Sequence, residues 1–131
     1  MDHEIPGRRY VNLPNRKSRL PFSDAVEAGG MLYISGRIGI DPATGNAPPE
    51  IQAELKFLFD DFAAVLAQAG MTMDDLVWVQ VFSPKISLWE EFNTAYLKRF
   101  STELPARAFI GSGPLLKGGR FEMMGIAVSR G

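Results

Sequence analysis

"IQAELKFLFDDFAAVLAQAG", residues 51–70, is the segment from which the fold is read most directly. Glu50 and Glu54 suit the positive end of a helix dipole, and Gly70 suits a helix C-terminal cap. The apolar residues recur at steps of three and four, which places them on one face of an α-helix: Ile51, Leu55, Leu58, Phe62, Val65 and Ala69. The pattern predicts an amphipathic helix over residues 50–69 that covers an apolar surface.

The segments on either side of this helix predict strands. Before it, "DAVEAGGMLYISGRIG" (24–39) has two short apolar runs around Gly29-Gly30, the pattern of a β-hairpin. After it, "DLVWVQVF" (75–82) is apolar on both faces, which is typical of a strand that is covered on both sides. Two further strands are expected near 106–110 and 121–129.

A second helix is expected between these strands. Ser87 and Glu90 have the spacing of a capping box, and the helix that they open should run to about Phe100. The predicted order is β-β-α-β-α-β-β, an α+β fold in which two helices pack on one face of a mixed sheet. Because the strands carry apolar residues on both sides, the uncovered face predicts a homo-oligomer.

The first twenty residues differ in composition from the rest. Pro6 and Pro14 interrupt regular structure, and the segment is basic: Arg8, Arg9, Arg16, Lys17 and Arg19. We read residues 1–20 as an extended basic N-terminal arm, which lies across the surface, is partly disordered or binds phosphate groups, and residues 21–131 as the folded domain. The N-terminus has no apolar core of a secretory signal and no apolar stretch reaches membrane-spanning length, so the expected location is cytoplasmic.

Composition narrows the chemistry. The chain has no cysteine and a single histidine, His3, so that disulfides, thiolate metal sites, a cysteine nucleophile and histidine-rich metal sites are not expected. No metal or organic cofactor is predicted. The formal net charge is −1, which gives no field to attract nucleic acid, so a nucleic-acid partner is not expected either.

Two charged residues stand inside apolar strand segments. Arg107 in "LPARAFIG" (104–111) is either half of a structural ion pair or an anchor whose two parallel N–H donors match a carboxylate. Glu122 in "RFEMMGIAV" (120–128) is a proton-transfer group if it is buried; otherwise it faces solvent or pairs with Arg107. The glycines of "SGRIG" (35–39) serve a hairpin end or a bulge, or allow the backbone to approach a ligand.

These segments, taken together, resemble the RidA family (YjgF/YER057c/UK114) of enamine/imine deaminases, over about Pro21 to Val128. The matching motifs are "PFSDAV", "YISGRIGIDPATG", "EEFNTAYLKRF", "LPARAFIG" and "FEMMGIAV". The resemblance implies a chorismate-mutase-like fold of the bacillus type and a homotrimer with its sites in clefts between neighbouring subunits. It also implies a deaminase of the 2-iminobutanoate/2-iminopropanoate type, which converts enamine/imine intermediates to 2-keto acids and ammonia.

The resemblance also assigns residues. Arg107 would bind the substrate carboxylate and Glu122 would position and activate water. The pocket would be lined by Phe22, Ser35, Gly36, Arg37, Asn93 and Phe109. Three of these depart from the family pattern, in which a tyrosine, a glutamine and a smaller residue are usual at 22, 37 and 109; a larger aromatic or anionic imino acid would fit such changes. Two alternatives remain: a non-catalytic sensor of small carboxylates, and an endoribonuclease, against which the near-neutral charge argues.

Overall fold

A computed structural model describes residues 2–16 and 20–130 of the chain. The elements are two helices and seven strands, with short 3₁₀ turns at Met73–Asp75, Ile86–Leu88 and Leu116–Gly118. In chain order they are β1 (Asp2–Ile5), β2 (Arg8–Val11), β3 (Ala25–Ala28), β4 (Met31–Ile38), α1 (Ile51–Gln68), β5 (Leu76–Ser83), α2 (Trp89–Leu97), β6 (Ala106–Gly111) and β7 (Glu122–Val128).

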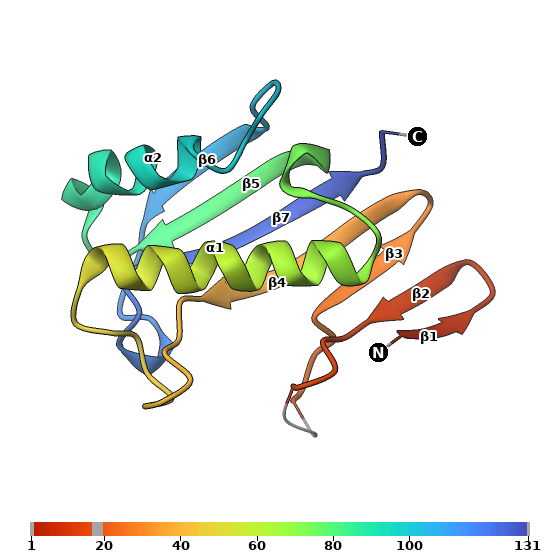
Figure 1. The fold of residues 1–131 in the computed structure, drawn as a ribbon, viewed down its shortest axis with the longest axis horizontal. Coiled ribbons are helices and arrows are strands. Elements are labelled where there is room, and N and C mark those ends of the chain that lie inside the picture. Colours follow the sequence, from red (N-terminus) through yellow and green to blue (C-terminus); the bar gives the residue numbers. More distant parts are fainter. Residues whose placement is uncertain (1, 17–19, 131) are drawn as a thin grey trace.

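All seven strands form a single mixed sheet in the order β1-β2-β3-β4-β7-β5-β6 (Figure 1). The last strand, β7, lies in the middle of the sheet, antiparallel to both β4 and β5. Strand β6 is parallel to β5, which it reaches through the crossover that contains α2. This order places β6, with Arg107, at one edge of the sheet and β7, with Glu122, two strands away.

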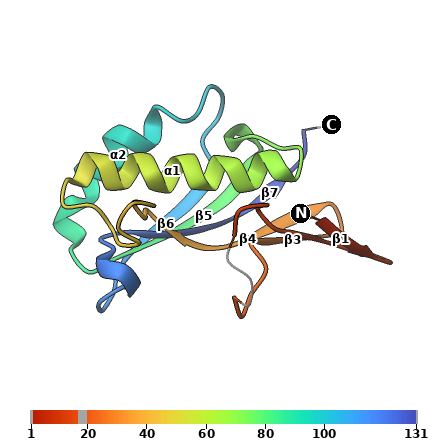
Figure 2. The same cartoon turned by 60° about the horizontal axis from the view of Figure 1, so that its bottom comes forward.

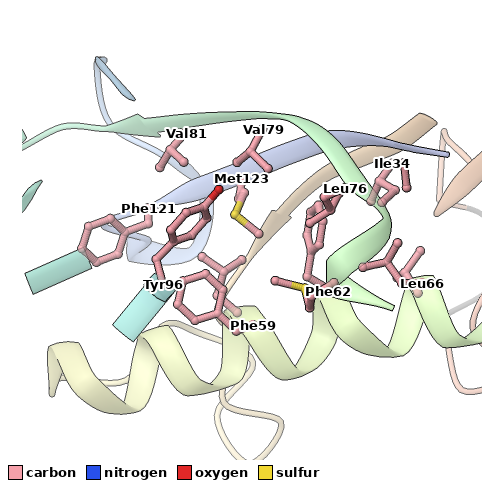
Figure 3. Close-up of a cluster of buried hydrophobic side chains, with 14 of the residues drawn as sticks. Ile34, Phe59, Phe62, Leu66, Leu76, Val79, Val81, Tyr96, Phe121 and Met123 are labelled. Carbon is pink, nitrogen blue, oxygen red and sulfur yellow. The ribbon is translucent and has the colours of Figure 1, made fainter. Parts of the chain in front are cut away.

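Both helices pack on the same face of the sheet, as Figure 2 shows, so the predicted α+β arrangement is confirmed. The core lies between α1 and the strands, where the rings of Phe59 and Phe62 face Val79 and Met123 (Figure 3). All four side chains are fully buried. The apolar stripe that the sequence shows on residues 51–69 is therefore the face that covers β4, β5 and β7.

The predicted hairpin of residues 24–39 is present as β3 and β4, with Gly29 and Gly30 at its turn. Both glycines have positive φ, +60° and +80°, which only residues without a Cβ adopt readily. The predicted strand after the helix is also present, as β5. Within the described residues, no helix has the length and hydropathy needed to cross a bilayer.

The start of the second helix differs from the prediction. A 3₁₀ turn at Ile86–Leu88 precedes α2, the residue at its N-cap is Leu88, and no side chain caps it. Ser87 therefore lies inside the turn and forms no capping box, and the helix ends at Leu97 instead of near Phe100. Packing of Leu88, Phe92 and Tyr96 into the core sets the position of this helix more strongly than its local cap signal.

The N-terminal segment also differs from the prediction of an extended arm. Strands β1 and β2 form a hairpin, and β2 pairs with β3 so that the hairpin extends the main sheet. Val11 is fully buried, and Arg9 forms an ion pair with Glu27 at 2.9 Å and donates to the carbonyl of Ala69. Among the basic residues of this segment, Lys17 and Arg19 lie outside the described residues.

The face of the sheet opposite the helices is apolar and uncovered. We call it the open face, and it carries Tyr33 on β4, Trp78 and Phe82 on β5, and Met124 and Ile126 on β7. Tyr33 is 46% exposed, and the other four side chains are half-buried. Tyr33, Trp78, Met124 and Ile126 line a shallow depression of about 220 Å³. A patch of this kind usually marks an interface.

The core makes a direct prediction about stability. Phe62→Ala should lower the free energy of unfolding by about 3–5 kcal/mol, because the ring is fully buried between α1 and the sheet. Urea unfolding measures the change. Leu116→Ala, at a side chain that is 77% exposed, is the control and should change the free energy by less than about 0.5 kcal/mol. Equal losses in the two variants would contradict this position of the core.

Candidate functional site

Arg107 lies on β6 and points to the helix side of the sheet. Its partner in the β5–β6 register is Val79, a core residue. The guanidinium Nη2 donates to Oδ1 of Asn93 on α2 at 2.7 Å. Asn93 is thus not merely a solvent-facing residue of α2, since it directs the guanidinium of Arg107.

Three aromatic rings surround the same guanidinium. Its central carbon lies 4.7 Å from the ring centroid of Tyr96, 5.4 Å from that of Phe92 and 5.7 Å from that of Phe109. The rings of Phe92 and Phe109 meet edge to face at 5.4 Å. We call Arg107, Asn93, Phe92, Tyr96 and Phe109 the arginine cluster. Cation–π attraction of this kind contributes about 0.5–2 kcal/mol per contact and holds the guanidinium in a defined place.

The positive charge of Arg107 has no carboxylate partner among the described residues. Arg37 and Arg120, by contrast, each reach a carboxylate oxygen within 2.7 Å. The interpretation of Arg107 as half of an ion pair with a protein acid is therefore wrong within this part of the chain. A half-buried guanidinium without a counterion is a site that an anion can fill.

Glu122 lies on the open face, at the start of β7. Its neighbour Met123 is fully buried on the helix side, so the glutamate side chain points the other way. A bulge in β4 between Ile34 and Arg37 places Gly36 against it. A Cβ on Gly36 would lie 2.1 Å from Oε2 of Glu122, so only glycine leaves room for this carboxylate. The glycine of "SGRIG" therefore serves both a bulge and a close approach.

Ser35, the chain neighbour of Gly36, is bonded to the segment that follows Phe22. The Ser35 hydroxyl donates to the carbonyl of Ser23 at 2.6 Å, and the Ser35 amide donates to the carbonyl of Asp24 at 3.0 Å. These bonds fix the segment that carries Phe22, whose ring is 46% exposed, next to the bulge. We call Glu122, Gly36, Ser35 and Phe22 the glutamate cluster.

The two clusters do not meet within one chain. Along β5, Arg107 is level with Val79 and Glu122 is level with Phe82, on opposite faces of the sheet. Strand spacing and residue rise put the two Cα atoms on the order of 14 Å apart. A single subunit therefore does not bring Arg107 and Glu122 together in one cleft.

Arg37, which the resemblance places in the lining of the pocket, is bound to carboxylates of the same chain. Its Nε and Nη2 donate to Asp61 on α1 at 2.7 and 3.2 Å, and its Nη1 donates to Asp24 at 2.7 Å. The side chain is only 12% exposed. Since all three guanidinium nitrogens bind protein carboxylates, we assign Arg37 to the support of the glutamate cluster rather than to substrate contact.

Asp24 is the centre of this supporting network. The side chain is 1% exposed, accepts from the Leu13 amide at 2.8 Å as well as from Arg37, and lies 3.5 Å from Arg16. Burial by itself would raise the pKa of Asp24, but the hydrogen bonds from Arg37 and Leu13 and the charges of Arg37 and Arg16 outweigh it and lower the pKa. Arg16 in turn donates to the carbonyl of Phe22 and lies over its ring at 5.7 Å.

A second buried ion pair fixes the start of β7. Glu54 on α1 is fully buried and accepts from the backbone amide and from Nε of Arg120, each at 2.6 Å. The guanidinium also donates to the carbonyls of Pro48 and Pro49. Because Arg120 stands two residues before Glu122, these bonds determine where the glutamate cluster lies relative to α1.

Nothing in this arrangement forms a metal centre. Among the described residues, no group of three or more histidine, cysteine, aspartate or glutamate side chains could hold an ion. The groups that these two clusters provide, among the described residues, are a guanidinium without a carboxylate partner, a carboxylate against a glycine, and aromatic side chains. Such a set suits the binding of a small carboxylate and the movement of a proton.

The comparisons with known proteins agree with the motifs that form these clusters. The sequence model of the endoribonuclease L-PSP family matches residues 14–129, which contain every residue of both clusters. The chain belongs to this family, the RidA (YjgF/YER057c/UK114) family. The resemblance inferred from the sequence is thereby confirmed.

Relatives in the RidA family carry several names. The chain is 35% identical over 123 residues, 92% of this chain and 90% of the relative, to a 2-iminobutanoate/2-iminopropanoate deaminase of Capra hircus. It is 31% identical over 108 residues, 82% of this chain and 85% of the relative, to a RutC family protein of Pyrococcus abyssi. A relative in Saccharomyces cerevisiae, protein MMF1, is described as mitochondrial, so the cytoplasmic location stays a prediction from the sequence.

Solved structures of the RidA family share the fold. A Rid family protein of Yersinia pestis has a TM-score of 0.85 at 32% identity and covers 93% of this chain and 99% of its own. Yeast Mmf1 has a TM-score of 0.78 at 30% identity, with 92% and 94% covered. The chorismate-mutase-like fold predicted from the motifs agrees with these neighbours.

Sequence reasoning missed several members of the two clusters and of the network that supports them, among them Asp24, Asp61, Phe92 and Tyr96. Asp24 and Asp61 gave no pattern of their own, although the arginine at position 37 signalled a need for nearby carboxylates. Tyr96 stands one turn after Phe92 on the same helical stripe and was read as core. Its position three residues after Asn93 was the available signal that it faces Arg107 as well.

Gly36→Ala should displace the Glu122 carboxylate while costing little stability. The new Cβ would overlap Oε2, which is the far end of a flexible side chain and can move away. We expect the free energy of unfolding to fall by less than about 1 kcal/mol and a crystal structure of the variant to show the carboxylate moved. Gly113→Ala, where no atom lies within 4 Å, is the control. An unmoved Glu122 would contradict the contact.

Asp24→Asn should destabilise the protein in a pH-dependent way. Removing one partner of a buried ion pair costs about 3 kcal/mol at pH 7. Because the folded pKa of Asp24 is lowered, its contribution is present above the unfolded value of about 3.9 and is lost as pH falls through the folded pKa. The gap between variant and wild type in urea unfolding should therefore shrink between pH 7 and pH 3.

Asp60→Asn is the control for this experiment. Asp60 pairs with Lys56 and Arg99 at the surface, where its side chain is 46% exposed. An exposed pair contributes less than about 1 kcal/mol, so this variant should stay close to wild type at both pH values. A loss for Asp24→Asn that is the same at pH 7 and pH 3 would contradict the role of its charge.

Proposed function

We propose that the protein is a deaminase of 2-imino acids, which hydrolyses reactive enamine/imine intermediates of the 2-iminobutanoate/2-iminopropanoate type to 2-keto acids and ammonia. The observation that carries the proposal is the half-buried guanidinium of Arg107, oriented by Asn93 and three rings and left without a carboxylate partner in the described chain. A substrate carboxylate would supply the missing anion. The name of the 35%-identical relative from Capra hircus supports the reaction.

The chemistry needs few groups. The enamine tautomerises to the imine, and Arg107 binds its carboxylate through parallel N–H donors, which fixes the C=N carbon. Glu122 accepts a proton from water as the water oxygen bonds to that carbon. Glu122 passes this proton to the imine nitrogen, which gives a neutral carbinolamine. It then takes the carbinolamine hydroxyl proton and delivers it to the amino nitrogen, so that the C–N bond breaks and ammonia leaves as the C=O bond forms. Imines hydrolyse unaided in water, so positioning and one proton-transfer group supply the modest acceleration required.

This mechanism requires Arg107 of one subunit and Glu122 of another. The separation of the arginine and glutamate clusters on opposite faces supports a site shared between copies of the chain. The open face, with Tyr33, Trp78 and Ile126, offers the apolar surface that would bring the copies together. A homotrimer with its sites between neighbouring subunits, as the family resemblance implies, satisfies both conditions.

The three departures from the family pattern bear on the substrate. The charge of Arg37 is offset by Asp24 and Asp61, so it supplies no surplus attraction for an anionic side chain. Phe22 and Phe109 present apolar walls, one in each cluster. We therefore favour an imino acid with an apolar or aromatic side chain over one with a second acid group.

A mixing experiment tests the function and the shared site together. Arg107→Ala and Glu122→Gln should each lower kcat/KM for enzymatically generated 2-aminoacrylate by about 100-fold or more. When the two variants are refolded as a mixture, about a quarter of the shared sites would regain a native arginine from one copy and a native glutamate from another. Ammonia release, followed continuously, should recover to a comparable fraction of the wild-type rate.

The controls separate the alternatives. Recovery must be absent when either variant is refolded alone. Mixed assemblies that form but stay inactive would contradict a site shared between subunits. If the wild type binds pyruvate through Arg107 yet never releases ammonia, the protein is a carboxylate sensor rather than an enzyme. An RNA-degradation assay tests the endoribonuclease activity that the family description names. Because the net charge of the chain is −1, we expect no RNA degradation.

A further inference from the structure

Tyr96 is the most buried polar side chain in contact with Arg107. It lies in α2, is 3% exposed, and packs its ring against Phe92 at 5.4 Å and Phe100 at 4.8 Å. Of the three rings around the guanidinium, its centroid is the nearest, at 4.7 Å. The ring alone would explain a phenylalanine at this position, as it does at Phe92 in the preceding turn.

The hydroxyl of Tyr96 is the part that packing does not explain. It is buried and makes no hydrogen bond of normal geometry among the described residues, although the Arg107 guanidinium lies close enough to act on it as a donor. Arg107 beside it carries only donors, so it cannot accept the phenol proton. The nearby amide oxygen of Asn93 already accepts from Arg107 at 2.7 Å. The group that is missing is therefore an acceptor, and it must lie next to a cation.

The phenol keeps its proton over the whole physiological range. Burial raises the pKa of Tyr96 to about 12, and the charge of Arg107 and hydrogen bonding from its guanidinium only partly oppose this. A buried hydroxyl without a partner lowers the stability of the protein relative to the same ring without the oxygen. A tyrosine at this place therefore costs stability in the unliganded chain, and an anionic acceptor would offset that cost.

We propose that Tyr96 is a carboxylate-binding residue, whose hydroxyl donates to one oxygen of the same substrate carboxylate that Arg107 binds. This inference rests on the proposed function and adds a contact to it. Because solvent does not reach the hydroxyl in the unliganded chain, the carboxylate would have to bind at the side of the phenol that borders Arg107, with a small movement of the surrounding rings. Arg107 then supplies charge, Asn93 fixes the guanidinium, and Tyr96 fixes the angle of the carboxylate plane.

Tyr96→Phe tests the proposal, because this substitution should raise the stability of the unliganded protein and weaken carboxylate binding. Without the unpartnered hydroxyl, the unliganded variant should unfold at a higher Tm than wild type. Without the donor, the inhibition constant of pyruvate, used as a carboxylate probe, and KM for 2-iminopropanoate should each rise about tenfold, as expected for a lost hydrogen bond to a charged group. kcat should change by less than about threefold.

Tyr10→Phe is the matched control. It removes a phenol hydroxyl from β2, which belongs to neither cluster, and should leave the pyruvate constant, KM and kcat at wild-type values. Tyr96→Leu, which also removes the ring over Arg107, should weaken pyruvate binding further than Tyr96→Phe does.

Several results would overturn the assignment. If Tyr96→Phe keeps the wild-type pyruvate constant and KM, the hydroxyl contacts no carboxylate. If it lowers Tm and weakens self-association while pyruvate binding is unchanged, the missing acceptor belongs to another copy of the chain. A failure of the proposed function itself looks different: wild type and Arg107→Ala would then be alike in showing neither ammonia release nor pyruvate binding.

Discussion

The charge of Arg107, which has no carboxylate partner among the described residues, is the constraint on which the candidate site depends. Removing a guanidinium from water without a counterion costs several kcal/mol, and the chain offsets only part of this. Asn93 supplies one neutral acceptor, and Phe92, Tyr96 and Phe109 supply their ring faces. Under the proposed function, the remainder is available for the binding of a substrate anion. A protein carboxylate in the same place would have stabilised the fold and filled the site.

The sheet keeps the two chemical groups apart in a single chain. Strand β7 lies in the centre with Glu122 on the open face, whereas β6 lies at the edge with Arg107 on the helix side. A single subunit thus holds the anion-binding group and the carboxylate on surfaces that cannot close on one substrate. The apolar open face gives a physical reason for copies of the chain to associate, and association is what would complete the site.

Buried ion pairs position the glutamate cluster. Asp24 joins Arg37 to the segment that carries Phe22, and Glu54 joins Arg120 to the start of β7. The arginine at position 37, which departs from the usual glutamine of the RidA family, is explained by its two aspartate partners, Asp24 and Asp61. The positive charge of Arg37 is therefore neutralised by carboxylates of the same chain.

The sequence by itself determined the elements that depend on local periodicity and on short motifs. The 3.6-residue stripe of residues 51–69 predicted α1, Gly29-Gly30 predicted the β3–β4 hairpin, and five motifs identified the RidA family. These signals are local because each depends on neighbouring residues alone. The start of α2 was not predicted correctly because packing of Leu88 outweighs the local cap signal. The N-terminal hairpin was not predicted because it depends on the pairing of β2 with β3.

Only the tertiary structure decided which functional residues are neighbours. Arg107 and Glu122 stand fifteen positions apart in adjacent motifs, yet the strand order places them on opposite faces of the sheet. The partners of Arg37, the glycine that admits Glu122, and the ring of Tyr96 over Arg107 are also contacts between separate segments. A sequence records which side chains are available, but burial and charge compensation depend on which strands become neighbours, and that is a property of the folded sheet.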